Sequence, residues 1–269
     1  MTAETDVQSD EYVAKVCDVL NRVSDVDALG ALSRAIAFDL GTSPLEHTAI
    51  VLDANVILRL SSHPRSADII DYLRTSFPGH LILPGQVVQE FWNNQFQVML
   101  TKAADIKRKF DELSKLIEGL DGRFEAFAHR FNETATAFSE TFGYIFDDKT
   151  VNKTKLLIDL LKEKAVVPFA PRTTLASTAL ARKRTKTPPG FKDDADGDFF
   201  VWSDLLLGLA RISGAGKKIQ RVSLVTLDKK IDWSRDGVPH PILSAEVYAI
   251  CGASLETLTI EVLAKRLLD

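Results

Sequence analysis

The residues in this sequence best suited to chemistry are four carboxylates, each at the end of a short apolar run or on a helix beside one. In an open parallel sheet, catalytic groups gather at the carboxyl ends of the strands. Carboxylates that meet there repel one another unless a cation lies between them, and hard divalent cations such as Mg²⁺ or Mn²⁺ prefer oxygen ligands. The pattern predicts a metal-dependent enzyme that acts on phosphate esters, with a site formed by Asp53, Glu90, Asp198 and Asp228.

Several polar residues lie at spacings that could support these carboxylates. Two divalent ions about 3.5–4 Å apart can clamp an in-line displacement at phosphorus, which requires three or four carboxylates from separate elements. Asn55 is two residues past Asp53, and Thr226 is two before Asp228, so it would point the same way along a strand. Asp232 follows Asp228 by four residues and Asp194 precedes Asp198 by four, the spacing of one helix face.

Each of these carboxylates also has a structural interpretation. Asp53 and Asp198 could be helix N-caps, Asp228 could end a turn, and Glu90 could be an exposed helix residue. The shared site is favoured because all four follow strands in the order that a sheet-edge site requires. Lysines close to them in the sequence could contact a phosphate, or could belong to ordinary surface loops: Lys192, Lys229 and Lys230.

Hydrophobic periodicity predicts the elements that would position these residues. Residues 1–10 look disordered. Two helices are expected between Glu11 and Phe38, with a break near Ser24 and with Asp25 or Asp27 capping the second. The remaining predicted elements are strands at 49–52, 80–83, 222–226 and 240–243, helices at 67–75, after Pro84 and at 197–211, helices alone from about 95 to 180, a basic loop at 182–191, and a strand-to-helix unit at 255–268.

Composition narrows the class of protein. The chain of 269 residues is 45% hydrophobic and 26% charged, typical of a soluble globular protein. It has no apolar run long enough to span a membrane, and its acidic start is not a signal peptide. Its two cysteines suggest neither a disulfide framework nor a zinc site, so a cytoplasmic location is expected. The net charge of −4 argues against a general nucleic-acid binder, although metal-held carboxylates would contribute to that charge.

Five stretches resemble the PIN-domain nucleases, and among them the larger PIN-like branch with a helical insertion. The resemblance extends from about residue 49 to residue 268, and in the middle it rests on helical character alone. The first stretch is weak alone, and its combination with the fourth and fifth stretches is the most specific part. The matching stretches are Ile50–Ile57, Leu83–Phe91, Pro189–Asp193, Gly197–Trp202 and Leu224–Trp233.

The resemblance implies a three-layer α/β/α fold with a central, mostly parallel sheet. On this interpretation the PIN-like nuclease domain spans 48–269, with a helical insertion at about 95–185, and an N-terminal helical extension spans 1–47. The long insertion and the extension depart from the ordinary short form of the family. The resemblance implies Mg²⁺- or Mn²⁺-dependent hydrolysis of RNA, or of single-stranded DNA, with the four carboxylates as catalytic metal ligands. It also suggests a prokaryotic toxin or defence effector with an inhibitory or defence-system protein partner. The sequence does not indicate an oligomeric state.

Two competing interpretations remain open at this point. A phosphohydrolase of the haloacid-dehalogenase type also begins with an aspartate after its first strand, but it needs a second aspartate where this chain has Asn55. The other alternative is a non-catalytic PIN-like scaffold that binds RNA or protein. Direct titration with Mn²⁺ separates a scaffold from an enzyme, because a scaffold has no reason to bind the ion at these carboxylates.

Overall fold

A computed structural model describes residues 3–37, 43–96, 104–119, 121–142, 148–228 and 230–269. Its centre is a five-stranded sheet in the order β3-β2-β1-β4-β7, and every neighbouring pair is parallel. The strands are β1 (Thr48–Leu52), β2 (His80–Ile82), β3 (Ala165–Val166), β4 (Arg221–Val225) and β7 (Ser254–Leu258). The predicted central parallel sheet is confirmed.

The two central strands are continuous buried runs. All five residues of β1 and all five of β4 are buried, as expected for parallel strands covered on both faces. The strand order reverses between them, because β2 and β3 lie on one side of β1 whereas β4 and β7 lie on the other. This switch point is where the loops after two adjacent strands diverge and leave room for a ligand.

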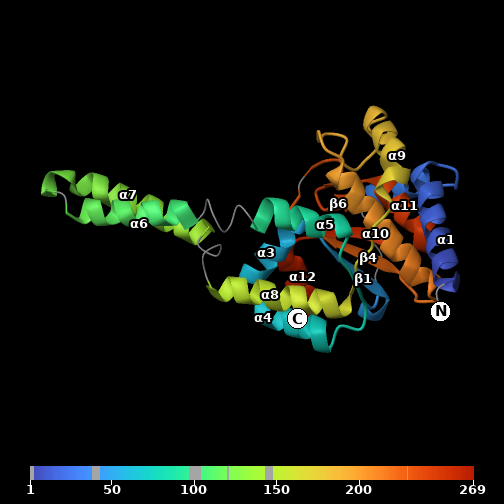
Figure 1. The fold of residues 1–269 in the computed structure, drawn as a ribbon, viewed down its shortest axis with the longest axis horizontal. Helices are drawn as coiled ribbons and strands as arrows, with labels where there is room; N and C mark the ends of the chain where they lie inside the picture. The colour runs from blue at the N-terminus through green and yellow to red at the C-terminus, as the bar shows by residue number, and fades with distance from the viewer. Residues whose placement is uncertain (1–2, 38–42, 97–103, 120, 143–147, 229) are drawn as a thin grey trace.

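Helices cover both faces of the sheet, which makes the three-layer α/β/α arrangement (Figure 1). On one face, four helices pack against one another: α3 (Ala54–Ser62), α4 (Ser66–Thr75), α8 (Asp148–Lys164) and α12 (Ile260–Leu268). The other face carries α1 (Ala3–Leu20), α2 (Ala28–Ile36), α5 (Gly85–Glu90), α10 (Gly197–Gly214) and α11 (Pro241–Cys251). No helix in the described ranges combines the length and apolar character that a membrane crossing requires.

The N-terminal extension differs from the prediction at its start. The structure places α1 from Ala3, so most of the segment expected to be disordered is helical. The break and the second helix agree with the prediction, and Asp27 is the N-cap of α2, where its side chain accepts a hydrogen bond from the amide of Gly30 at 2.8 Å. The apolar side of α1 joins the core through Val16, Val19 and Leu20.

The described residues of the middle segment between Ala104 and Val166 include three α-helices and one strand. Helices α6 (Ala104–Glu118) and α7 (Glu125–Phe142) pack on each other, with the rings of Phe110 and Phe131 5.7 Å apart, and extend away from the sheet (Figure 1). By contrast, α8 packs on α3 and α4, and β3 follows it directly as an edge of the sheet. The prediction of helices alone missed β3, because two residues are too few to show alternation.

Near the C-terminus, one predicted strand is a helix in the structure, and one predicted strand-to-helix unit is confirmed. The strand expected at 240–243 is wrong, because Pro241 opens helix α11, with His240 as N-cap accepting from the amide of Ile242 at 3.2 Å. Helix α11 is apolar on several sides and so lacks the helical period that exposed helices show. The strand-to-helix unit at 255–268 is confirmed by β7 and α12. The chain also forms a short antiparallel pair, β5 (Ser234–Arg235) and β6 (Val238–Pro239).

Candidate active site

Asp53 and Thr226 meet at the switch point of the sheet. The register pairs Leu52 with Val225, so the next residue of each strand emerges at the same edge. The Thr226 hydroxyl donates to Oδ2 of Asp53 at 2.7 Å and accepts from the amide of Asp228 at 2.9 Å. One hydroxyl therefore links the carboxylate after β1 to the backbone amide of Asp228 after β4. The sequence predicted that Thr226 and Asp228 would point the same way if the strand continued, but β4 ends at Val225.

Other donors complete the shell of Asp53. As N-cap of α3, Asp53 accepts from the amide of Ala54 at 2.6 Å through Oδ1, and from Nδ2 of Asn55 at 2.8 Å through Oδ2. Asn55 in turn accepts from the amide of Leu227 at 3.1 Å, which fastens the loop after β4. Burial raises the pKa of Asp53 and the charge of Asp228 adds to this, although the hydrogen bonds from Thr226, Ala54 and Asn55 act in the opposite direction.

Glu90 reaches the same region from α5. It lies on one face of that helix with Gln86, whose Nε2 donates to Oε1 of Glu90 at 3.1 Å. The N-terminus of α10 approaches closely, because a Cβ placed on Gly197 would stand 2.6 Å from the same Oε1. Burial raises the pKa of Glu90, and the charges of Asp53 and Asp198 raise it further. The carboxylates of three separate elements therefore act on one another.

Asp198 lies in the first turn of helix α10, and a tryptophan orients its side chain. Nε1 of Trp233 donates to Oδ2 of Asp198 at 3.0 Å, while the ring of Trp233 packs edge-on against Trp202 at 6.0 Å. Burial raises the pKa of Asp198 to about 6. Sequence reasoning placed neither tryptophan among the site residues, and both are buried. It missed the hydrogen bond from Trp233, because no spacing links that residue to Asp198.

A lysine ammonium lies among these carboxylates. Nζ of Lys230 is 2.7 Å from Oδ2 of Asp193, 3.0 Å from Oδ2 of Asp198 and 3.4 Å from Oδ2 of Asp228. Burial acts to raise the pKa of Asp193, but its hydrogen bonds with Lys230 and Asp198 and the charges of Lys230 and Lys183 together outweigh burial, and the net pKa is lowered. Lys230 was predicted to contact substrate, and here its ammonium is the positive charge that holds three carboxylates together.

The sequence suggested that Asp232 faces the same centre as Asp228, but its side chain points elsewhere. Its side chain is fully buried, and Oδ2 accepts from the amide of Gly190 at 2.9 Å. The loop that contains Gly190 is also held at the carbonyl of Pro188 by the buried guanidinium of Arg182. Arg182, expected in a basic loop, belongs to helix α9 (Arg172–Arg184) and pairs with buried Glu246. These buried groups fix the loop that leads into Asp198.

Gly190 tests how strictly that loop positions Asp198. Its φ is +79°, a conformation that residues with a side chain rarely adopt, and an added Cβ would lie 3.0 Å from Cβ of Asp198. We expect Gly190→Ala to lower the free energy of unfolding by about 1 kcal/mol or more. Chemical denaturation measures this change, with Gly122→Ala as the control because a Cβ there meets no atom within 4 Å. An unchanged stability would contradict the proposed constraint.

The remaining predicted residues lie at the margin of the cluster or beyond the description. Lys192 is exposed in the loop before α10, and Asp194 is exposed as well. Helix α10 begins at Gly197, so Asp194 does not share a helical face with Asp198; its backbone carbonyl accepts from Lys183 at 2.7 Å. Lys229 lies outside the described residues.

The donor chemistry of the cluster fits a hard divalent cation. The side chains that converge offer carboxylate oxygens, and the ammonium of Lys230 stands in for a cation among them. Within the described ranges, no three histidine, cysteine, aspartate or glutamate side chains are close enough together to enclose a metal ion. Carboxylates around an ammonium are spaced more widely than around Mg²⁺, whose oxygen ligands lie at about 2.0–2.1 Å. A metal would therefore draw these side chains inward.

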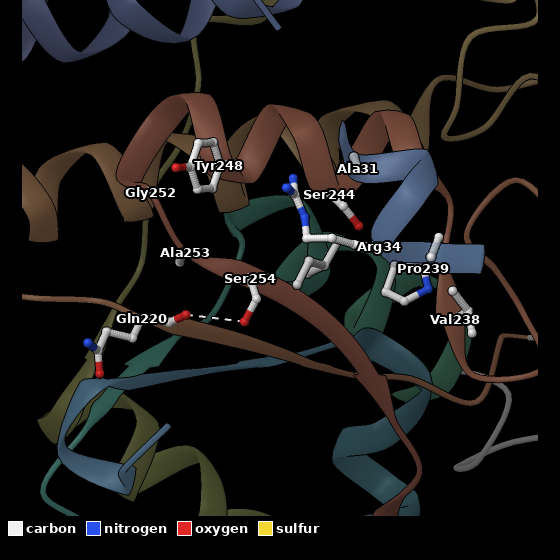
Figure 2. A pocket seen from close by; sticks show the side chains of 12 residues that line it. Ala31, Arg34, Gln220, Val238, Pro239, Ser244, Tyr248, Gly252, Ala253 and Ser254 are labelled. Carbon is white, nitrogen blue, oxygen red and sulfur yellow. Dashed lines mark hydrogen bonds between the residues drawn. The ribbon is translucent and has the colours of Figure 1, made fainter. Parts of the chain in front are cut away.

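Two of the hollows lined by described residues differ in character. Figure 2 shows one between α2, α11 and the starts of β4 and β7, where Oγ of Ser254 donates to the carbonyl of Gln220 at 3.2 Å. Its lining contains no carboxylate among the described residues, and it lies at the amino ends of the strands. The other, of about 480 Å³, is lined by Thr226, Asp228 and Arg235 among others and opens beside the acidic cluster.

Comparison with known proteins agrees with this arrangement. The PIN-like domain family matches residues 49–168 and 147–240, which together exceed half of the chain, so the chain belongs to the PIN-like domain family. Proteins of this family are generally nucleases, and PIN domains typically use divalent metals. No curated protein matches. No solved structure matches either.

Proposed function

We propose that this protein is a divalent-metal-dependent nuclease that hydrolyses phosphodiester bonds in RNA. The observation that carries the proposal is that the Thr226 hydroxyl joins the Asp53 carboxylate to the backbone amide of Asp228. In addition to burial, the charge of Asp228 raises the pKa of Asp53, and the charges of Asp53 and Asp198 raise the pKa of Glu90. The four carboxylates are proposed to bind the cation jointly. When bound, such an ion supplies Lewis-acid activation of a water and neutralises charge on the phosphate.

The chain's own side chains have distinct proposed roles. Asp53 accepts hydrogen bonds from three neutral donors, which orient its two oxygens before any ligand arrives. Asp198 is oriented by Trp233. Glu90 has a raised pKa and lies across the cluster on α5, so it is suited to accept a proton from the attacking water at a carboxylate oxygen.

The surroundings of the cluster supply a path for a single strand. The hollow beside Asp228 shares Ile231, Arg235 and Asp236 with a second hollow of about 610 Å³, whose lining is mostly apolar and includes Phe191. A flexible strand could follow both hollows, with a phosphate at Arg235 and an unstacked base against Phe191, the pairing of cation and aromatic ring that single strands favour. This path favours single-stranded RNA over a rigid duplex.

A cleavage assay tests the proposal. Purified protein is incubated with a labelled single-stranded RNA, its DNA counterpart and the RNA duplex, each with Mn²⁺, with Mg²⁺ or with EDTA. We expect RNA cleavage with either metal, none with EDTA, and slower cleavage of the duplex. Cleavage of DNA alone would show that the substrate is DNA and not RNA. Absence of cleavage together with absence of Mn²⁺ binding would support the scaffold interpretation instead. A toxin or defence role and an inhibitory protein partner stay predictions from the resemblance.

A further inference from the structure

The position of Lys230 follows from the turn after β4. Its backbone amide donates to Oδ1 of Asp228 at 2.7 Å, which turns the chain so that the lysine side chain folds back over the strand end. There its ammonium reaches one carboxylate from its own loop, one from the start of α10 and one from the loop before α10. The side chain of Lys230 is 36% exposed, so it has room to leave this position.

A metal ion and this ammonium cannot share Asp198 and Asp228. The ammonium stands 3.0 Å and 3.4 Å from the Oδ2 atoms of these residues, and a divalent cation would bind the same oxygens at about 2.0–2.1 Å. Two cations so close together would also repel each other strongly in a half-buried site. Binding of the metal therefore requires Lys230 to move.

Asp193 offers Lys230 a partner outside the four proposed ligands. It makes the shortest of the three contacts, 2.7 Å, and its side chain is one-third exposed at the edge of the cluster. Lys230 can thus give up Asp198 and Asp228 while keeping an ion pair with Asp193. At that edge its ammonium would face an arriving phosphate, the role that the sequence suggested for it.

We propose that Lys230 is a tethered counter-ion, which neutralises Asp198 and Asp228 in the metal-free protein and exchanges with the divalent cation while Asp193 retains it at the rim. This inference rests on the proposed function, because it assumes that the carboxylates bind a metal. If Lys230 acts in this way, the affinity for the metal depends on the competing ammonium as well as on the carboxylate ligands. Removing the lysine should strengthen metal binding, whereas removing its rim partner should weaken it.

Calorimetric titration with Mn²⁺ tests the exchange. Lys230→Met removes the competing charge from two partly exposed ion pairs, so we expect Mn²⁺ to bind about 5- to 30-fold more tightly than to wild type. Asp193→Asn leaves Lys230 with only the ligand carboxylates, so binding should weaken about threefold. Lys230→Arg keeps the charge and should shift the affinity less than Lys230→Met does.

Lys192→Met is the matched control, because it removes one positive charge from an exposed position in the neighbouring loop. It should bind Mn²⁺ within about twofold of wild type, since exposed charges at a distance are screened. A second readout is thermal unfolding. In EDTA, Lys230→Met should unfold about 2–4 °C below Lys192→Met, and saturating Mn²⁺ should remove that difference.

The results that overturn the exchange are distinct from those that overturn the proposed function. If wild type binds Mn²⁺ and Lys230→Met binds it no more tightly than Lys192→Met, the lysine does not compete and only this inference fails. Weaker binding by Lys230→Met would make the lysine a support of the metal site and would likewise overturn it. If wild type binds no Mn²⁺, the proposed function fails as well.

Discussion

Asp53→Asn is expected to lower the rate of RNA cleavage by on the order of 10³-fold while leaving the fold intact. Among the four proposed ligands, Asp53 accepts the most hydrogen bonds from neutral donors, from Ala54, Asn55 and Thr226. The amide replaces one anionic oxygen by a donor that repels a cation. A loss of this size corresponds to about 4 kcal/mol of transition-state stabilisation, typical of a group that acts on developing charge.

Stability separates this loss from unfolding. Burial and the charge of Asp228 raise the pKa of Asp53, so its negative charge is unfavourable in the metal-free protein. The neutral variant gains from the loss of this charge but loses at least one of the hydrogen bonds that Asp53 accepts, so it should melt close to the temperature of wild type in EDTA. Asp71→Asn, on an exposed part of α4, is the control and should cleave at the wild-type rate. Wild-type cleavage by Asp53→Asn would remove Asp53 from the mechanism.

Glu246→Gln is expected to lower the free energy of unfolding by about 3–5 kcal/mol, because it leaves a buried guanidinium without its counter-ion. Glu246 is fully buried and lies 2.7 Å from Arg182 and 2.6 Å from Arg22. It also accepts from Nε1 of Trp202 at 2.6 Å. This one carboxylate joins helices α9, α10 and α11 to the end of the N-terminal helix α1.

Urea denaturation measures this prediction, with Glu133→Gln as control. Glu133 is exposed on α7 and pairs with the exposed His129, so its loss should change stability by less than about 0.5 kcal/mol. The folded fraction of Glu246→Gln should also cleave more slowly, since Arg182 holds the carbonyl of Pro188 in the loop before Asp198. Equal stability of the two variants would show that the buried ion pairs are dispensable.

The parts of the fold that sequence reasoning predicted are those with a strong local signal. Strand β1 is apolar apart from one threonine, β4 also contains an arginine and a serine, and each is followed by a polar residue, Asp53 or Thr226. Their parallel pairing follows from helices on either side of them in the chain. Asn55 was predicted from its position two residues after Asp53, and Thr226 from its position two residues before Asp228. Both spacings are local, and in the folded chain both side chains donate to Asp53.

What the sequence could not predict depends on tertiary contacts. Helix α11 is buried on several sides and was mistaken for a strand, and β3 is too short to have a pattern. Trp233 reaches Asp198 across 35 residues, and Asp232 reaches the amide of Gly190 across 42. The partners of Lys230 also come from separate segments, so its position among the carboxylates required the folded structure.

The most direct test of the central claim is anomalous diffraction from crystals soaked in Mn²⁺. The account predicts a manganese peak bounded by the carboxylates of Asp53, Asp198 and Asp228, with the ammonium of Lys230 moved toward Asp193. A protein that binds Mn²⁺ elsewhere, or that shows no anomalous peak at these three side chains at saturating metal, would contradict it.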